Sequence, residues 1–205
     1  MCCASSAWLD AQLKIVQEGA LDPLCRLLTS TDIEILQQVC GCFDNLTLSD
    51  ENKHEIAKSG AVPALITLTQ FPVMEVASQA CSSLANLAEI PANHDLLFDE
   101  GVIEPCLKAM RNNFVEVQRE AGRLLANLCA ASSDHTNKIT ERNGHTLLIS
   151  NLMSQDTACQ RVAALGINNL ATRPEHRQTI MQCGALEPLC GLARSSDVEL
   201  EIQRF

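Results

Sequence analysis

This 205-residue chain is poor in aromatic residues, which make up 3% of it, and it contains no tyrosine. β-Sandwiches and β-barrels need aromatic and β-branched residues at alternating positions, so the composition argues against both. Long apolar runs are missing too: no stretch approaches about 18 consecutive apolar residues, and no direct membrane insertion is expected. The chain does not open with a basic segment, so we expect no secretory signal peptide.

Positive charge is also scarce, because 15 Lys and Arg residues face 25 Asp and Glu residues, for a net charge of −10. This balance argues against non-specific binding to nucleic acid or to an anionic membrane. Sequence signatures of catalysis are absent, including the nucleophile elbow, the phosphate-binding loop, the dinucleotide fingerprint and the HExxH motif. We therefore expect no enzymatic activity, no cofactor and no nucleic-acid partner.

Two series of residues recur along the chain at nearly constant spacing. Glycines lie 41, 41, 43 and 40 residues apart, at Gly19, Gly60, Gly101, Gly144 and Gly184. Asn-Leu pairs lie 41, 41 and 42 residues apart, beginning at Asn45, Asn86, Asn127 and Asn169. A period of about 40–47 residues is typical of a helical solenoid. We therefore predict one solenoid of five units, covering residues 9–47, 48–88, 89–131, 132–172 and an incomplete 173–205.

One unit shows the expected helices. A short polar helix over 49–58 begins after Ser49, a good N-cap residue, and ends at Gly60, which suits a left-handed C-terminal cap. A second helix over 62–68 carries Pro63 in its first turn, where the missing N–H is tolerated. A third helix runs from about 74 to 88. Two helices per unit are an alternative, but the polar helix before each glycine favours three.

The third helix carries the most regular apolar columns. Small or apolar residues stand ten, six and two positions before each ladder asparagine and again directly after it. This spacing places them on one buried face of a helix. The three columns before the asparagine comprise Ile35, Val76, Val117 and Cys159; Val39, Ala80, Ala121 and Ala163; and Phe43, Leu84, Leu125 and Ile167.

The three-helix unit, with a glycine before a Pro-containing helix and Asn-Leu near the end of the third, resembles the armadillo family over essentially the whole chain. The similarity is to scaffolds of the β-catenin, importin-α and yeast vacuolar type. It implies an all-α, right-handed superhelix whose third helices line a concave groove for an extended peptide. The fourth unit departs from the pattern, because His145-Thr146-Leu147 replaces the usual apolar, Pro-containing start of the second helix.

The resemblance places the ladder asparagines in that groove. A primary amide can donate to and accept from the backbone of an extended peptide, so Asn86 and Asn127, and less centrally Asn45 and Asn169, are candidate ligand-binding residues. The alternative is that each amide bonds to local backbone. Importin-α-type readers carry tryptophan four residues before the asparagine, where this chain has Gly41, Ser82, Arg123 and Leu165. Recognition of nuclear-import signals is therefore not expected.

Four arginines share the predicted groove face: Arg119, Arg123, Arg161 and Arg173. They lie four or eight residues from a ladder asparagine, which is close to whole helical turns. Arginine binds carboxylate or phosphate through two parallel hydrogen bonds, so the cluster predicts docking of an acidic extended segment. The alternative is a solvated face on which these side chains pair with Glu116 and Glu120.

Histidine and cysteine do not indicate a metal site. Four of the five histidines, His54, His94, His135 and His176, fall near the start of successive first helices and are too far apart to share an ion. The 11 cysteines include no CxxC pair, and Cys40 and Cys81 occupy positions that hold small residues in other units. We predict reduced thiols and a cytoplasmic or nuclear location. Whether Cys2 and Cys3 are acylated is left open.

Both ends look like interrupted repeats. Residues 1–6 resemble the end of a third helix, and residues 198–205 resemble the start of one. We expect a fragment of a longer array that self-associates through exposed apolar ends. The predicted function is a non-enzymatic scaffold or adaptor that holds an extended, acidic segment of another protein. The alternative is a structural spacer that acts through its ends or its convex face.

Overall fold

The computed structural model describes residues 11–194, and all regular structure within that range is helical. The terminal stretches compared above with third helices, 1–6 and 198–205, lie outside it. After helical residues 11–17, the elements are α2 (Leu21–Leu27), α3 (Ile33–Leu46), α4 (Asp50–Lys58), α5 (Ala61–Leu68), α6 (Met74–Leu87), η1 (Pro91–Asn93), α7 (His94–Asp99), α8 (Ile103–Ala109), α9 (Val115–Leu128), α10 (Ser133–Glu141), α11 (Gly144–Asn151), α12 (Thr157–Ala171), α13 (Pro174–Gln182) and α14 (Leu186–Arg194).

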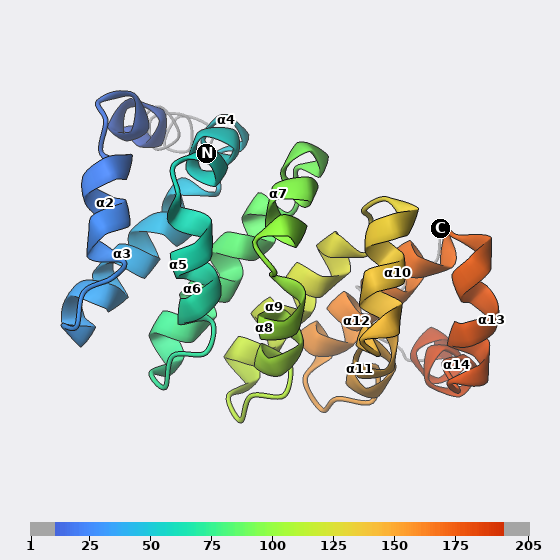
Figure 1. The fold of residues 1–205 in the computed structure, drawn as a ribbon. Helices are drawn as coiled ribbons and strands as arrows, with labels where there is room; N and C mark the ends of the chain where they lie inside the picture. Colours follow the sequence, from blue (N-terminus) through green and yellow to red (C-terminus); the bar gives the residue numbers. More distant parts are fainter. Residues whose placement is uncertain (1–10, 195–205) are drawn as a thin grey trace, which may run out of the picture.

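The helices repeat in groups of three, which confirms the all-α solenoid and its three-helix unit (Figure 1). Each complete group has two short helices followed by a longer third helix of 14 or 15 residues. The third helices α3, α6, α9 and α12 pack side by side and make the most extensive contacts between neighbouring groups. The core is therefore a continuous stripe along the stack, as expected when each repeat packs only on its neighbours.

The predicted apolar columns form this core. Phe43, Leu84 and Leu125 are fully buried at the position two residues before the ladder asparagine. The one exception is Ile35, which is 37% exposed although Val76, its counterpart in the next repeat, is fully buried. The difference arises because α3 covers α6, whereas no described third helix precedes α3.

The left-handed position between the first and second helices is occupied by glycine in four repeats, for example at Gly60 with φ 86°. The fourth repeat differs, although Gly144 continues the glycine series of the sequence. Asn143 adopts the left-handed conformation there, with φ 60°, and Gly144 is the first residue of α11. Asparagine tolerates this region better than other non-glycine residues, so the one-residue shift is accommodated.

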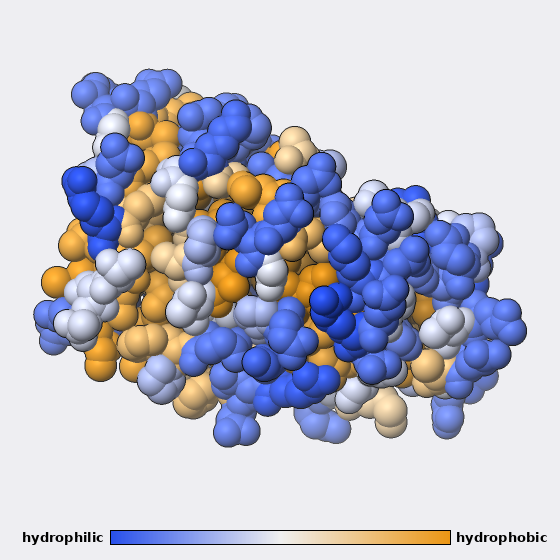
Figure 2. Space-filling model, in the orientation of Figure 1, coloured by the Kyte–Doolittle hydropathy of each residue, from blue (hydrophilic) through white to orange (hydrophobic). Residues whose placement is uncertain are grey.

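One face of the stack is shown by residue hydropathy in Figure 2. Hydrophobic residues are more extensive over its N-terminal half, and hydrophilic residues cover more of its C-terminal half. Isolated apolar side chains such as Leu27 and Met153 are exposed, which is common on protein surfaces. Within residues 11–194, no helix has both the length and the apolar character needed to cross a membrane.

Candidate functional site

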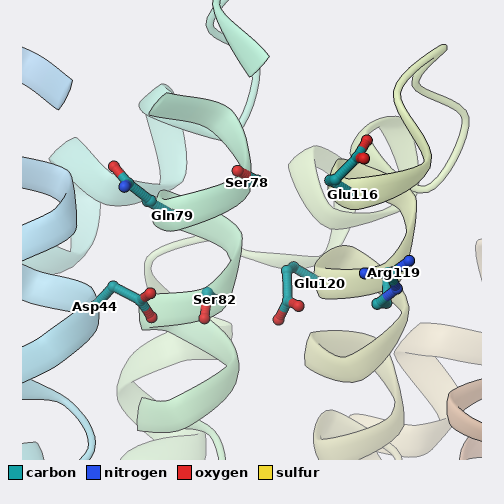
Figure 3. A pocket seen from close by; sticks show the side chains of 7 residues that line it. All are labelled: Asp44, Ser78, Gln79, Ser82, Glu116, Arg119 and Glu120. Atoms are coloured by element: carbon teal, nitrogen blue, oxygen red, sulfur yellow. The ribbon is translucent and has the colours of Figure 1, made fainter. Parts of the chain in front are cut away.

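The third helices present a polar surface on which most of the predicted site residues lie. At its centre, a hollow of about 430 Å³ opens to solvent between α3, α6 and α9. The side chains around it come from these three helices (Figure 3): Asp44, Ser78, Gln79, Ser82, Glu116, Arg119 and Glu120. Three of the seven are carboxylates and one is cationic, so the hollow is acidic.

Arg123 connects α9 to α6 beside this hollow. Its Nη1 donates to Asn86 Oδ1 at 2.7 Å, and its Nη2 donates to Ser82 Oγ at 2.9 Å. The same guanidinium pairs with Glu120 at 2.9 Å and with Glu89 at 3.4 Å. Because all three guanidinium nitrogens donate to groups of the protein itself, Arg123 acts first as a link between two repeats.

Asn86 lies at the centre of the same network and is only 3% exposed. Its Nδ2 donates to Thr47 Oγ1 at 3.0 Å, with Asp44 Oδ1 at 3.5 Å, while its Oδ1 accepts from Arg123. Both ends of the amide are therefore engaged within the protein. Its predicted contact with a ligand backbone would require one of these hydrogen bonds to be exchanged.

The next two ladder asparagines form an identical contact one repeat apart. Asn127 Nδ2 donates to the backbone oxygen of Ala85, and Asn169 Nδ2 donates to that of Ala126, both at 2.9 Å. The sequence analysis gave bonding of each amide to local backbone as the alternative to ligand binding. The observed contact matches this in part, because the acceptor is a backbone oxygen, but that oxygen belongs to the preceding repeat. Both side chains are half-buried, and Asn45 is exposed. No described residue donates to the Oδ1 atoms of Asn127 and Asn169, so these oxygens are available to a ligand.

Arg119 lies at the edge of the hollow, on the side of α9 that is away from α6 (Figure 3). Its Nη2 pairs with Asp156 Oδ2 at 2.7 Å, and Asp156 also caps α12 by accepting from the Cys159 backbone N–H at 2.8 Å. The alternative interpretation of the sequence was a solvated face on which Arg119 pairs with Glu116 or Glu120 of its own helix. The observed partner is 37 residues away, so this ion pair joins two repeats.

The two remaining arginines lie further along the chain. Arg161 is half-buried on α12. Arg173 is the N-cap residue of α13; it donates to the backbone oxygen of Ala131 at 2.7 Å and to Ser133 Oγ at 3.2 Å. Its partners are neutral, so Arg173 keeps its net charge. Arg119, Arg123 and Arg173 thus all bond to groups of the protein itself, and the predicted role of the four arginines in ligand binding stays a prediction.

The sequence analysis did not identify two charged residues of this surface, Asp44 and Lys53. Asp44 directly precedes a ladder asparagine, and burial raises its pKa above the ordinary value although a hydrogen bond with Ser82 opposes the shift. Lys53 is 3% exposed, and its Nζ lies 2.6 Å from both Asp50 and Glu89.

The Asp156 contact predicts an acid-dependent loss of stability. Arg119 first, and then the Cys159 N–H, lower the pKa of Asp156 to about 2. A carboxylate whose pKa is lowered on folding stabilises the protein fully above its unfolded pKa of about 3.9, and this contribution is lost as the pH falls toward 2. We expect Asp156→Asn, which preserves the cap, to lower the free energy of unfolding equally at pH 7 and 5, and less below about pH 4.

Urea unfolding at each pH would measure this difference. Asp32→Asn is the matched control, because Asp32 caps α3 in the same way and forms no ion pair with a described residue. A deficit for Asp156→Asn that stays constant from pH 7 down to about pH 3 would contradict the assignment.

Known proteins similar to this chain share its repeat and its fold. Residues 11–48 and 49–89 each match the family described as Armadillo/beta-catenin-like repeat. A solved engineered protein is 25% identical with a TM-score of 0.90, over 95% of this chain and 81% of its own. A second engineered protein is 30% identical with a TM-score of 0.89, over 94% of this chain and 48% of its own.

A designed armadillo repeat protein in complex with the peptide (KR)4 is 24% identical, with a TM-score of 0.88 over 94% of this chain and 82% of its own. At this identity the similarity concerns the fold. No curated protein sequence matches the chain. Among residues 11–194, no group of three or more His, Cys, Asp or Glu side chains is arranged to hold a metal ion.

Proposed function

Because the chain is an armadillo-repeat protein, we propose that it is a non-enzymatic scaffold or adaptor that holds an extended segment of another protein along its third helices. The observation that carries this proposal is the shared geometry of Asn127 and Asn169. Each donates its amide N–H to the preceding repeat and keeps its Oδ1 free of described donors. Two such acceptors, one repeat apart, suit the backbone N–H groups of a bound strand.

The spacing of the repeats fits an extended ligand. Packed helices lie about 8–10 Å apart, and an extended chain advances about 3.3 Å per residue. Successive asparagines would therefore meet every second or third ligand residue. Ligand side chains that point toward the protein would then reach the hollow between α6 and α9.

The charge of the ligand follows from which protein charges are already neutralised. An acidic segment was predicted from four arginines, but Arg119 and Arg123 are paired with carboxylates. That proposal therefore depends chiefly on Arg173, whose hydrogen-bond partners Ala131 and Ser133 are neutral.

Of the three carboxylates around the hollow, Glu120 is paired with Arg123, whereas Asp44 and Glu116 form no ion pair with a described residue. These two carboxylates favour a lysine or arginine side chain, so we propose that the ligand is basic where it crosses α6 and α9.

Binding of two oppositely charged peptides would test the proposal. We expect fluorescent (KR)4 to bind, and Glu116→Lys to weaken its binding about tenfold, because one favourable charge contact becomes repulsive. Glu116 is exposed and forms no ion pair with a described residue, so the variant should fold. Glu104→Lys, at an exposed position of α8, changes net charge equally and should alter Kd less than about twofold at physiological salt.

Each outcome is informative. Equal losses of (KR)4 affinity in Glu116→Lys and Glu104→Lys would show that the peptide responds only to net charge. That result would contradict a subsite for basic side chains in the hollow. Binding of (DE)4 that is weakened by Arg173→Glu would instead support the acidic segment. If Asn127→Ala leaves the affinity of every bound peptide unchanged, the proposed role of the asparagines in holding the backbone is wrong.

A further inference from the structure

The guanidinium of Arg123 lies in a site that is built from the residues of two repeats. Its Nε donates to Glu120 at 3.0 Å, its Nη1 to Asn86 Oδ1 at 2.7 Å, and its Nη2 to Ser82 Oγ at 2.9 Å. Nη2 also donates to the Ser82 backbone oxygen at 3.3 Å, and Glu89 lies 3.4 Å from Nη1. Every one of these partners accepts a hydrogen bond, so the site is complementary to a planar cation with donors on three nitrogens.

Arg123 fills a position that stays open in the next repeat. It stands four residues before Asn127 and reaches back to Asn86, the ladder asparagine of the preceding repeat. The corresponding residue of the following repeat is Leu165, whose side chain has no donor, and Asn127 Oδ1 accepts from no described residue. Arg123 therefore occupies, at Asn86, the place that the proposed function gives to a ligand at Asn127.

The site carries an excess of negative charge that Arg123 neutralises. Glu120 and Glu89 pair with its guanidinium directly, and Asp44 lies close enough to interact with it electrostatically. Lys53 balances part of the charge of Glu89 from 2.6 Å. The side chains of Arg123 and Glu120 are 28% and 25% exposed, so water screens their attraction only in part. Loss of the guanidinium would leave partly buried carboxylates uncompensated, and a second cation would be favoured in its place.

The geometry of the acceptors favours arginine over lysine as that cation. Glu120, Asn86 and Ser82 are contacted by three different nitrogens of one flat group. The lysine ammonium concentrates its donors on a single nitrogen and does not reproduce this arrangement. Ser82 and Glu120 also line the hollow between α3, α6 and α9 (Figure 3), so the site can be reached from the surface that would hold the ligand.

We propose that the acceptors around Arg123 form a binding site for an arginine side chain of the bound segment, and that Arg123 fills this site in the unliganded protein. The inference rests on the proposed function, because the incoming arginine belongs to the segment that the third helices hold. A ligand arginine must compete with a side chain that is tethered beside its acceptors at high effective concentration. Arg123 therefore lowers the affinity for arginine-containing segments, and its removal should raise it.

Binding of octaarginine and octalysine, which carry equal charge, would test the site. We expect Arg123→Ala to bind octaarginine about tenfold more tightly than the wild type, and to bind octalysine less than about threefold more tightly. Arg119→Ala is the matched control, because it removes the same charge from α9 but leaves Arg123 in place. It should change the affinities of the two peptides by the same factor. Equal gains for both peptides in Arg123→Ala would overturn the proposal, because the site would then respond to charge alone.

Thermal unfolding with small cations tests the site without any peptide. About 20 mM methylguanidinium should raise the Tm of Arg123→Ala by about 2 °C more than methylammonium does, and the two should act equally on the wild type. If neither peptide binds any variant, the proposed function is wrong, and this Tm difference still decides whether the guanidinium site exists. Equal Tm values with the two cations would overturn the site.

A second variant covers the case in which Arg123→Ala does not fold. Arg123→Lys keeps the positive charge between α6 and α9, but its single nitrogen leaves part of the acceptors open. Methylguanidinium should therefore stabilise it more than methylammonium does, in the same thermal measurement. Equal stabilisation by the two cations in Arg123→Lys would contradict a site shaped for a guanidinium.

Discussion

Phe43→Ala is expected to lower the free energy of unfolding by about 3–5 kcal/mol. The Phe43 ring is fully buried in α3, where this helix packs against α6. Removing it eliminates the apolar contacts of the ring and leaves a cavity that neighbouring helices fill only in part. Because α3 is a main contact of the following repeat, the effect should extend beyond the first unit.

Urea unfolding followed by far-UV circular dichroism would measure the change. Phe114→Ala is a control of the same chemistry, because Phe114 is 44% exposed at the N-terminus of α9. We expect its effect to be below about 1 kcal/mol. Similar losses for the two variants would show that Phe43 does not carry the core contact described for it.

Gly144→Ala is expected to lower the free energy of unfolding by about 1–3 kcal/mol through steric overlap. A Cβ atom at Gly144 would lie 2.6 Å from Ile139 Cγ2 and 3.1 Å from the Ile139 backbone oxygen. Both atoms belong to Ile139, whose backbone lies in α10 and whose β-branched side chain is fully buried, so there is little room for adjustment. The first turn of α11 would therefore have to move away from α10.

Asn143→Gly provides the opposite control at the adjacent residue. It places glycine at the left-handed position, as in the other repeats, and should leave stability within about 1 kcal/mol of wild type. Thermal unfolding of both variants would distinguish the two positions. If Gly144→Ala were tolerated and Asn143→Gly were strongly destabilising, the left-handed cap would lie at Gly144, in step with the glycine series, and not at Asn143.

The histidine and arginine side chains show where sequence reasoning stopped. The arginines were placed correctly on helices, but their partners were not identified: Arg119 meets Asp156 and Arg123 meets Asn86, each 37 residues away. His145 was noted only as an isolated histidine without ligands, and its burial at the start of α11 was not foreseen. The packing of one repeat on the next makes each of these contacts.

The sequence by itself determined the solenoid, the three-helix unit and the buried faces. These features depend on periodicities of 3.6 and about 41 residues and on local signals such as the cap at Gly60, all of which act over short stretches of chain. Tertiary structure decided which polar groups meet between repeats and which remain available to a ligand. A small rotation between adjacent helices changes these partners without changing the apolar pattern, so the sequence pattern does not contain them.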